Sequence, residues 1–412
     1  MTLYSRKWNQ HKTRYLVLVV SLCTYVIFYL NRLNLSAVLP LIIQDTRLSY
    51  AEASLVTSLF FITYALSQLF WGNLADSIGS LKTICIGGLL VALSNFLFSE
   101  SRSLLQFMIA QCVNGWSQGA GWSPLIKLIA NWFEEHERTI AMGLFTTAVP
   151  LSMLISYVLA GWLESNFGWR SAFAIPALMM LCITIILRLV AQDAPKKLGE
   201  QHPLKDKKNI NINGALRLVL SNIAVWKIGV CYSFFLFSYW GIATWLPTYL
   251  VKAMSVSIFD ATLISGTAMA SGIISRPLAG LLANKVFRER EDRLIILCFI
   301  GSIPFVYLVS QSRNIIFLVS FLFISCFLLQ VPFPLLLTYQ VELLPRRLSG
   351  TVTGFVNFLG QASSALSMIL TGLLLDSFRK YEPVFVMFST SLLLAALTVL
   401  SVKKEETHGN VL

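Results

Sequence analysis

Long apolar runs separated by short polar segments make up most of the chain. The runs lie at about residues 15–38, 51–75, 82–99, 104–131, 139–163, 169–190, 223–250, 261–284, 293–311, 314–340, 348–375 and 382–402. A transmembrane helix needs about 20 mostly apolar residues, and each run approaches or exceeds that length. The pattern therefore predicts an all-α membrane protein with twelve transmembrane helices.

One longer polar stretch interrupts the pattern between the sixth and seventh runs. It is rich in lysine and ends in a short apolar segment at 212–220, which predicts a helix on the membrane surface. We expect residues 1–190 to form an N-terminal six-helix bundle, 191–222 a cytoplasmic linker, and 223–412 a C-terminal six-helix bundle.

Composition narrows the class of protein. Of the 412 residues, 56% are hydrophobic and 13% are charged, whereas soluble domains carry about 25% charged residues. A soluble enzyme, a disordered chain and a secreted disulfide scaffold are therefore excluded. The seven cysteines lie inside apolar runs without metal-ligand spacing. We expect neither a metal nor a cofactor.

The net charge of +12 carries information on orientation. With the N-terminus inside, 21 of the 32 Lys and Arg residues fall in cytoplasmic segments and seven in the opposite loops. Cytoplasmic loops of membrane proteins carry such an excess. We therefore expect a multi-pass protein of the cell (inner) membrane with both termini cytoplasmic. Its basic residues face the lipid bilayer surface, and no nucleic acid is expected as a partner.

The two halves of the chain echo each other. The segment 72–76 stands 208 residues before 280–284, and 28–40 aligns with 235–247 at an offset of 207. Repeats at nearly one offset predict two pseudo-symmetric six-helix bundles that alternate access to a central site.

Arg32 is the most deeply placed charge. It lies about 17 residues into the first run, roughly 25 Å along a helix from the cytoplasmic end, beyond the reach of a snorkelling side chain. Intramembrane charges usually face a cavity or a partner, and a guanidinium group binds carboxylate or phosphate through paired hydrogen bonds. We expect Arg32 to bind an anionic substrate. The alternative is an arginine bound to helix-end carbonyls near the outer side.

Other polar and aromatic residues recur within the runs. Each alone can serve helix packing, but a set that faces one cavity would form a polar site with an aromatic wall. The further candidates for substrate binding are Tyr64, Gln68, Asn114, Gln118, Tyr239, Trp240, Gln330, Asn357 and Gln361. Lys127 lies near the cytoplasmic end of its run, where it can line the substrate path or extend to the inner surface.

The segment from Gly72 to Lys82 resembles the signature of the major facilitator superfamily between helices 2 and 3. The family's aspartate and second glycine stand here as Asp76 and Gly79, while Ser80 replaces the first basic residue. The resemblance implies the major facilitator fold and a latch on the cytoplasmic side. We expect the cytoplasmic gate to consist of Asp76, Gly79, Lys82, Arg138, Arg276, Asn284 and Arg290.

A closer resemblance covers most of the first half. Segments 29–40, 114–124 and 168–170 resemble the organophosphate/phosphate antiporters and the anion/cation symporters, and 245–250 resembles the phosphate antiporters. By this likeness Arg32 would bind the substrate's anionic group.

Some positions depart from those branches. Tyr239 stands where the antiporters carry a second arginine, and Val149 where they carry a histidine. Asn31 and Gln111 replace an aspartate and an arginine of the carboxylate symporters.

The acidic and histidine side chains bear on mechanism. No Asp, Glu or His lies in the middle of a run, and membrane proton relays use such groups. Anion exchange or uniport is therefore favoured over proton symport. We expect a monomeric rocker-switch transporter of a small organic anion, such as a sugar acid, a carboxylate or an organophosphate. An exporter of a drug- or siderophore-like compound and a transporter-like ligand sensor remain alternatives, and no motif indicates an enzyme.

Overall fold

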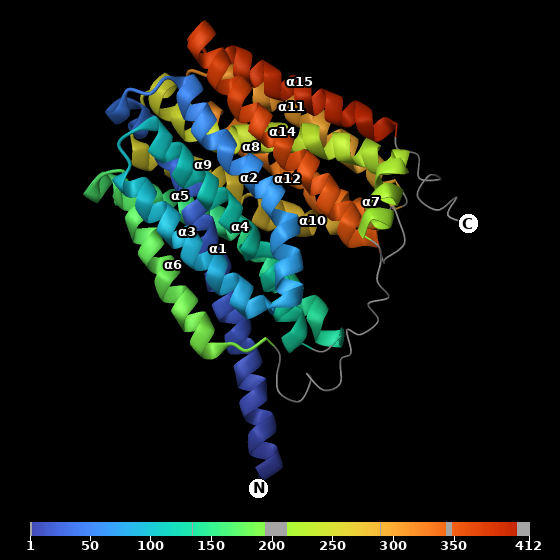
Figure 1. Cartoon of the computed structure of the whole chain (residues 1–412). Helices are drawn as coiled ribbons and strands as arrows, with labels where there is room; N and C mark the ends of the chain where they lie inside the picture. The colour runs from blue at the N-terminus through green and yellow to red at the C-terminus, as the bar shows by residue number, and fades with distance from the viewer. Residues whose placement is uncertain (1, 134, 194–211, 289, 343–347, 402–412) are drawn as a thin grey trace.

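The computed structural model describes residues 2–133, 135–193, 212–288, 290–342 and 348–401. These residues are almost entirely helical (Figure 1). In the first half the helices are α1 (Thr2–Thr46), α2 (Tyr50–Ser77), α3 (Ser80–Glu100), α4 (Leu104–Trp132), α5 (Glu135–Phe167) and α6 (Ser171–Val190). They are followed by α7 (Ile212–Ser221), α8 (Ile223–Met254), α9 (Ile258–Ala270), α10 (Gly272–Lys285), α11 (Glu291–Gln311), α12 (Ile315–Gln330), α13 (Pro332–Glu342), α14 (Ser349–Phe378) and α15 (Glu382–Leu400).

Each of the twelve predicted spans coincides with one helix or with a pair of helices. Within the described ranges, ten helical segments are long and apolar enough to cross a membrane, and α2 makes an eleventh with a bend of 40° between Gln68 and Phe70. The remaining span is α4, which is less apolar because it carries Gln111, Asn114 and Gln118. The twelve-helix prediction is confirmed.

Two spans are broken in the middle. The break between α9 and α10 falls at Ser271, and the break between α12 and α13 falls at Val331. Pro332 follows the second break, as expected for a residue that has no N–H to continue the helical ladder. Both breaks lie beside the central cavity described below.

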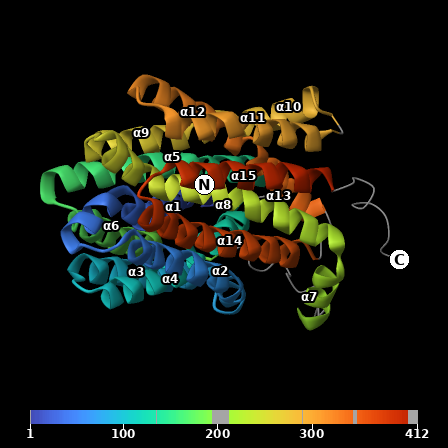
Figure 2. The same ribbon diagram turned by 90° about the horizontal axis from the view of Figure 1, so that it is seen from above.

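The first helix is longer than its apolar run predicts. It extends from Thr2 to Thr46, whereas the run covers only residues 15–38. Near its end, the carboxylate of Asp45 accepts hydrogen bonds from Trp169 Nε1 at 3.0 Å and Arg170 Nη1 at 3.3 Å. Helix α7 forms where a short surface helix was predicted, and it projects from the edge of the bundle in Figure 2.

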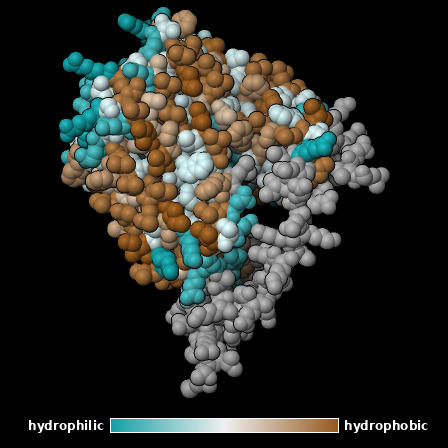
Figure 3. Space-filling view, viewed as in Figure 1, coloured by the Kyte–Doolittle hydropathy of each residue, from teal (hydrophilic) through white to brown (hydrophobic). Residues whose placement is uncertain are grey.

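The helices pack into one elongated bundle with an apolar surface. Between the first and second halves of the chain, α2 lies against α14, α5 against α9, and α1 against α8. In Figure 3 most of the visible face is hydrophobic, and hydrophilic residues gather near its upper left and lower edges. This distribution suits a protein whose middle is surrounded by lipid.

Candidate functional site

A cavity of about 440 Å³ lies in the centre of the bundle, between the two halves of the chain. Small-molecule sites in proteins have volumes of about 300–1,000 Å³, so it can hold a small metabolite. Its lining residues are Tyr25, Tyr29, Arg32, Tyr64, Gln68, Trp122, Gly143, Thr146, Val149, Pro150, Tyr232, Leu236, Trp240, Gly272, Ile273, Arg276, Pro277, Phe333, Pro334, Leu337, Asn357 and Gln361.

The cavity extends from Arg32 toward one end of the bundle. Tyr25 precedes Arg32 on α1, Gln68 lies in the second half of α2, and Gly143 lies near the start of α5. All of these positions are nearer to the end that holds the α2–α3 and α4–α5 connections than to the opposite end.

At the opposite end the two halves are in close contact. The carboxylate of Asp376 on α14 accepts hydrogen bonds from the backbone N–H groups of Tyr50 and Ala51, which begin α2. On the next pair of helices, a Cβ atom added to Gly161 of α5 would overlap with Thr262 Oγ1 of α9. The lack of a side chain at Gly161 therefore allows the two helices to meet. The molecule is closed at this end, which lies at the upper left of Figure 1.

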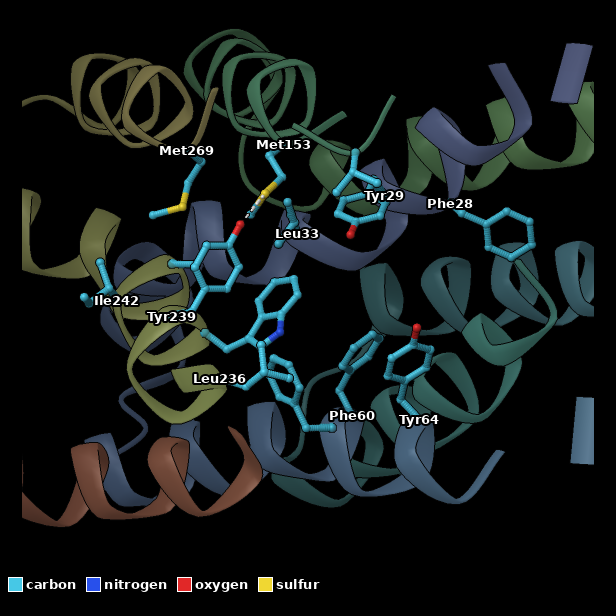
Figure 4. Close-up of a cluster of buried hydrophobic side chains, with 14 of the residues drawn as sticks. Phe28, Tyr29, Leu33, Phe60, Tyr64, Met153, Leu236, Tyr239, Ile242 and Met269 are labelled. Carbon is cyan, nitrogen blue, oxygen red and sulfur yellow. Dashed lines mark hydrogen bonds between the residues drawn. The ribbon is translucent and has the colours of Figure 1, made fainter. Parts of the chain in front are cut away.

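Arg32 lies at the closed end of the cavity in a cage of aromatic rings. The centre of its guanidinium group is 4.4 Å from the ring centroid of Trp240 and 4.6 Å from that of Tyr64. The rings of Phe60 and Tyr29 lie at 5.3 and 5.5 Å. Such contacts stabilise a cation without neutralising it. In Figure 4 the hydroxyl groups of Tyr29 and Tyr64 point toward each other across this region.

The charge of Arg32 has no protein counter-ion within the described residues. Its Nε and Nη2 atoms are buried and have no hydrogen-bond acceptor there. Leaving a buried charged donor without an acceptor is costly, whereas a carboxylate or phosphate oxygen would satisfy both atoms. The arrangement favours an anionic ligand at this point of the cavity.

Arg276, which was expected at the cytoplasmic gate, lines the same cavity from the second half of the chain. Its Nε donates a hydrogen bond of 3.1 Å to Gln330 Oε1, and its guanidinium centre lies 4.4 Å from the ring centroid of Phe333. The described wall of the cavity thus holds two arginines and no Asp, Glu, Lys or His.

Of the other predicted binding residues, Tyr64, Gln68, Trp240, Asn357 and Gln361 line the cavity. Asn114 and Gln118 do not: their side-chain amides donate to the backbone oxygens of Asn31 and Phe28 at 2.8 and 2.9 Å, which ties α4 to α1. A polar stripe on one helix face predicts buried amides, but it does not tell a cavity wall from a helix interface.

Tyr239 and Gln330 also lie behind the cavity wall. The hydroxyl of Tyr239 is directed at Met153 Sδ on α5, at 3.2 Å (Figure 4). Gln330 is fully buried and donates from Nε2 to the backbone oxygen of Met269. Both residues were expected to contact the substrate. In the structure their polar atoms bind protein partners instead.

Lys127 does not line the described cavity. Its ammonium group lies 2.7 Å from Asp76 Oδ1 and 2.8 Å from the backbone oxygen of Ala75. Lys82, which was expected at the cytoplasmic gate together with Asp76, has an exposed side chain that makes no hydrogen bond or ion pair within the described residues. In this state Asp76 thus joins α2 to α4 within one half of the chain.

The remaining gate residues lie at the same end. Gly79 has a φ of +97°, and Leu81 N donates at 2.7 Å to the Asp193 carboxylate, which fills the space beside the glycine. Asn284 and Arg290 are exposed, and their side chains make no hydrogen bond or ion pair in the described ranges. Arg138 lies on α5, but its side chain is outside the described part.

Four aromatic residues on or beside the cavity wall were not singled out from the sequence: Tyr25, Tyr29, Trp122 and Phe333. Tyr25 and Tyr29 precede Arg32 by seven and three residues, the spacing that places side chains on one helix face. This periodicity was a usable signal. Trp122 and Phe333 join the wall only through the packing of α4 and α13.

Comparison with known proteins identifies the family. The model of the Major Facilitator Superfamily matches residues 21–368. The chain belongs to this superfamily. Its fold is that of the superfamily: the chain superposes with a TM-score of 0.83 on a bacterial homologue of the human lysosomal transporter Spinster, in an inward-facing and occupied conformation. The identity is 15%, over 97% of this chain and 99% of that one.

Curated relatives cover nearly the whole chain. A glycerol-3-phosphate transporter of Bacillus subtilis (strain 168) is 27% identical over 90% of this chain and 88% of the relative. The membrane sensor protein UhpC of Escherichia coli (strain K12) is 23% identical over 98% of this chain and 94% of the relative. The resemblance to the organophosphate branch of the superfamily is thereby confirmed, and the protein is a multi-pass membrane protein.

Proposed function

We propose that this protein transports a small organic anion across the cell membrane by alternating access, with Arg32 as the main anion-binding residue. The observation that carries the proposal is a buried guanidinium group on the wall of a closed-ended central cavity, with two donor atoms that find no acceptor in the described part of the chain. Membership of a transporter superfamily and a relative named as a glycerol-3-phosphate transporter support it.

The same proposal assigns a state to the molecule. With both termini in the cytoplasm, the cavity faces inward and the Asp376–α2 contact closes the outer side. In the outward-facing state the α2–α14 and α5–α9 contacts separate, and the segments 76–82 and 284–290 approach each other as the cytoplasmic gate. We assign residues 1–190 and 223–412 to the two bundles that rock as units in a monomer, with 191–222 as the linker.

Coupling is proposed to be anion exchange or uniport. Proton-coupled membrane transporters use Asp, Glu or His side chains within the membrane. None of these residue types is found on the described cavity wall. Exchange of one anion for another needs only a binding site that both can occupy.

Uptake into proteoliposomes tests the function. Purified protein is reconstituted with internal phosphate or dicarboxylate, and uptake of labelled organic anions is measured for the wild type, Arg32→Gln and Arg32→Lys. A hydrogen bond to a charged group contributes about 1.5–3 kcal/mol, so Arg32→Gln should raise the half-saturating concentration at least tenfold. Arg32→Lys keeps the charge but not the paired donors, so its half-saturating concentration should lie between those of the wild type and of Arg32→Gln.

Arg313, an exposed residue in the α11–α12 connection, supplies the matched control. Arg313→Gln removes one arginine from the same chain and should leave the uptake unchanged. If the half-saturating concentration of Arg32→Gln equals that of the wild type, Arg32 does not bind the substrate in transport.

A ligand sensor is a second candidate, favoured by the similarity to the sensor UhpC over nearly the full length of both chains. Counterflow separates the two functions. A transporter accumulates labelled anion against an internal unlabelled pool, while a sensor binds the anion without counterflow. Export of a drug- or siderophore-like compound would instead appear as binding of neutral amphipathic ligands that does not depend on Arg32.

A further inference from the structure

We propose that Arg276 is a second anion-binding residue, and that the substrate carries an anionic group at each end, one bound by Arg32 on α1 and the other by Arg276 on α10. The inference rests on the proposed transport of an organic anion and names the class of anion. It would make the two halves of the chain hold opposite ends of one molecule.

The guanidinium group of Arg276 is held in a fixed orientation. Gln330 Oε1 accepts the Nε–H of Arg276 at 3.1 Å, while Gln330 Nε2 donates to the backbone oxygen of Met269 at the α9–α10 break. A Cβ atom added to Gly272 would overlap with Gln330 Oε1, so a glycine at the break makes room for this amide. Gln330 is therefore a positioning residue, since its bond to Nε sets the plane of the guanidinium group.

The charge on the cavity wall points to a dianion. Arginine stays protonated at all relevant pH values. The other ionisable side chains on the described wall are tyrosines such as Tyr232, which are neutral near pH 7. A ligand with one negative charge would leave one of the two guanidinium groups unbalanced inside the membrane, whereas a ligand with two would balance both.

The two arginines have different surroundings in the cavity, because Arg32 lies on α1 and Arg276 on α10. The ring contacts of Arg32 and of Arg276 involve different side chains, with Trp240 closest to Arg32 and Phe333 beside Arg276. Arg32 also lines a smaller pocket of about 20 Å³ toward the closed end, whereas Arg276 does not. These different surroundings favour two anionic groups, one at each arginine, over one phosphate held by both.

The cavity wall also carries two uncharged amide side chains from α14. These are Gln361 and Asn357, and Gln361 Oε1 is buried without a hydrogen-bond donor within the described residues. A hydroxyl group on the substrate would supply that donor. The substrate class that fits is a short dicarboxylate, or an acid with a sulfonate or phosphate at its other end, with at least one hydroxyl group.

Binding of matched dianions and monoanions tests the proposal. Affinities of the purified full-length protein are measured for succinate, glutarate and adipate and for the mono-amide of each. We expect the wild type to bind at least one dicarboxylate about tenfold or more tightly than its mono-amide, since the second carboxylate gains a charge-assisted bond. In Arg276→Gln the ratio should fall to about threefold or less, with binding of the mono-amide retained.

Two further variants separate charge from folding. Gln330→Glu keeps Arg276 and places a carboxylate at its Nε, so the dicarboxylate should lose its advantage as in Arg276→Gln. Arg276→Lys keeps the positive charge and should retain a clear preference for the dicarboxylate. Merely structural damage would weaken the binding of a dicarboxylate and of its mono-amide equally. The melting temperatures without ligand show whether each variant is folded.

The outcomes distinguish this inference from the proposed function. If Arg276→Gln keeps the wild-type ratio, or if the wild type prefers no dicarboxylate over its mono-amide, the two-ended site is refuted while Arg32-dependent anion transport stands. If anion binding does not depend on Arg32 either, both proposals are refuted. Glycerol 3-phosphate that binds through both arginines, with no preference for dicarboxylates, would also refute the two-ended site.

Discussion

The carboxylate of Asp376 joins the two halves at the closed end. Its removal should shift the molecule toward a state that is open at this end. Asp376 accepts hydrogen bonds from Tyr50 N at 3.1 Å and Ala51 N at 2.7 Å. The next donor of α2, Glu52 N, binds the Ser49 hydroxyl in a capping box. The first N–H groups of α2 thus depend on a side chain from the other half only while this end is closed.

The magnitude follows from the exposure of the contact. Asp376 is exposed, and a carboxylate at an exposed helix N-terminus contributes about 0.3–1 kcal/mol. Two direct N–H bonds place this contact at the upper end of that range. When the halves separate, water takes over both donors. Asp376→Ala should therefore destabilise the closed end by about 1 kcal/mol, which raises the population open at this end about fivefold.

Thiol labelling measures this population. Thr57 is 3% exposed and lines the small pocket between Arg32 and the closed end. A thiol introduced there by Thr57→Cys reacts with a charged, membrane-impermeant reagent only when this end opens. Labelling above the background of the native cysteines should be about five times faster when Asp376→Ala is added.

Asp260 supplies the control for loss of charge. It lies at the start of α9, where Ser257 donates to its carboxylate within the same half of the chain. Asp260→Ala, combined with Thr57→Cys, should leave the labelling at position 57 unchanged. An equal acceleration in both variants, or none with Asp376→Ala, would show that the Asp376 contact does not hold this end closed.

Three further changes probe other contacts. Gly161→Val places atoms where a Cβ alone would overlap with Thr262 Oγ1, so it should prevent closure, abolish transport and raise labelling at position 57; unchanged transport would contradict this packing. Gln118→Leu removes one buried hydrogen bond between helices and should lower stability by about 1 kcal/mol, seen as a lower melting temperature, without changing anion affinity; weaker anion binding would return Gln118 to the site. Lys127→Met removes an ion pair with side-chain exposures of 29% and 47%, which is worth less than about 1 kcal/mol, so initial uptake rates should stay within about threefold.

The helices were largely predictable because lipid imposes a simple rule on them. Backbone polar groups must be satisfied inside each span, so hydrophobic length alone locates helices such as α6 and α15. The break after Val331 was indicated by Pro332, whose ring cannot continue the ladder. The break at Ser271 had no comparable signal, because neither Ser271 nor Gly272 prevents helix formation on its own.

The cavity wall was predictable only in part. A deep arginine in a single helix is visible in the sequence, so Arg32 could be named. From the sequence, Lys127 was expected on the substrate path or at the inner surface, and Arg276 at the cytoplasmic gate. Their surroundings differ because α2 brings Asp76 to Lys127 while α12 brings Gln330 to Arg276. Partners 50 or so residues away are set by helix packing, which hydropathy does not encode.

The polar interior of α4 also bears on how the chain enters the membrane during synthesis. Asn114 and Gln118 would each be costly in contact with lipid, and α4 alone is a poor substrate for insertion. The three helices that pack most extensively against it, α1, α2 and α3, all precede it in the chain, and α5 adds a smaller contact. The three helices are synthesised before α4, so α4 can pack against them as it enters the membrane. Its amides can then bind the backbone oxygens of Asn31 and Phe28. Order of synthesis thus makes possible a transmembrane helix that hydropathy alone would not support.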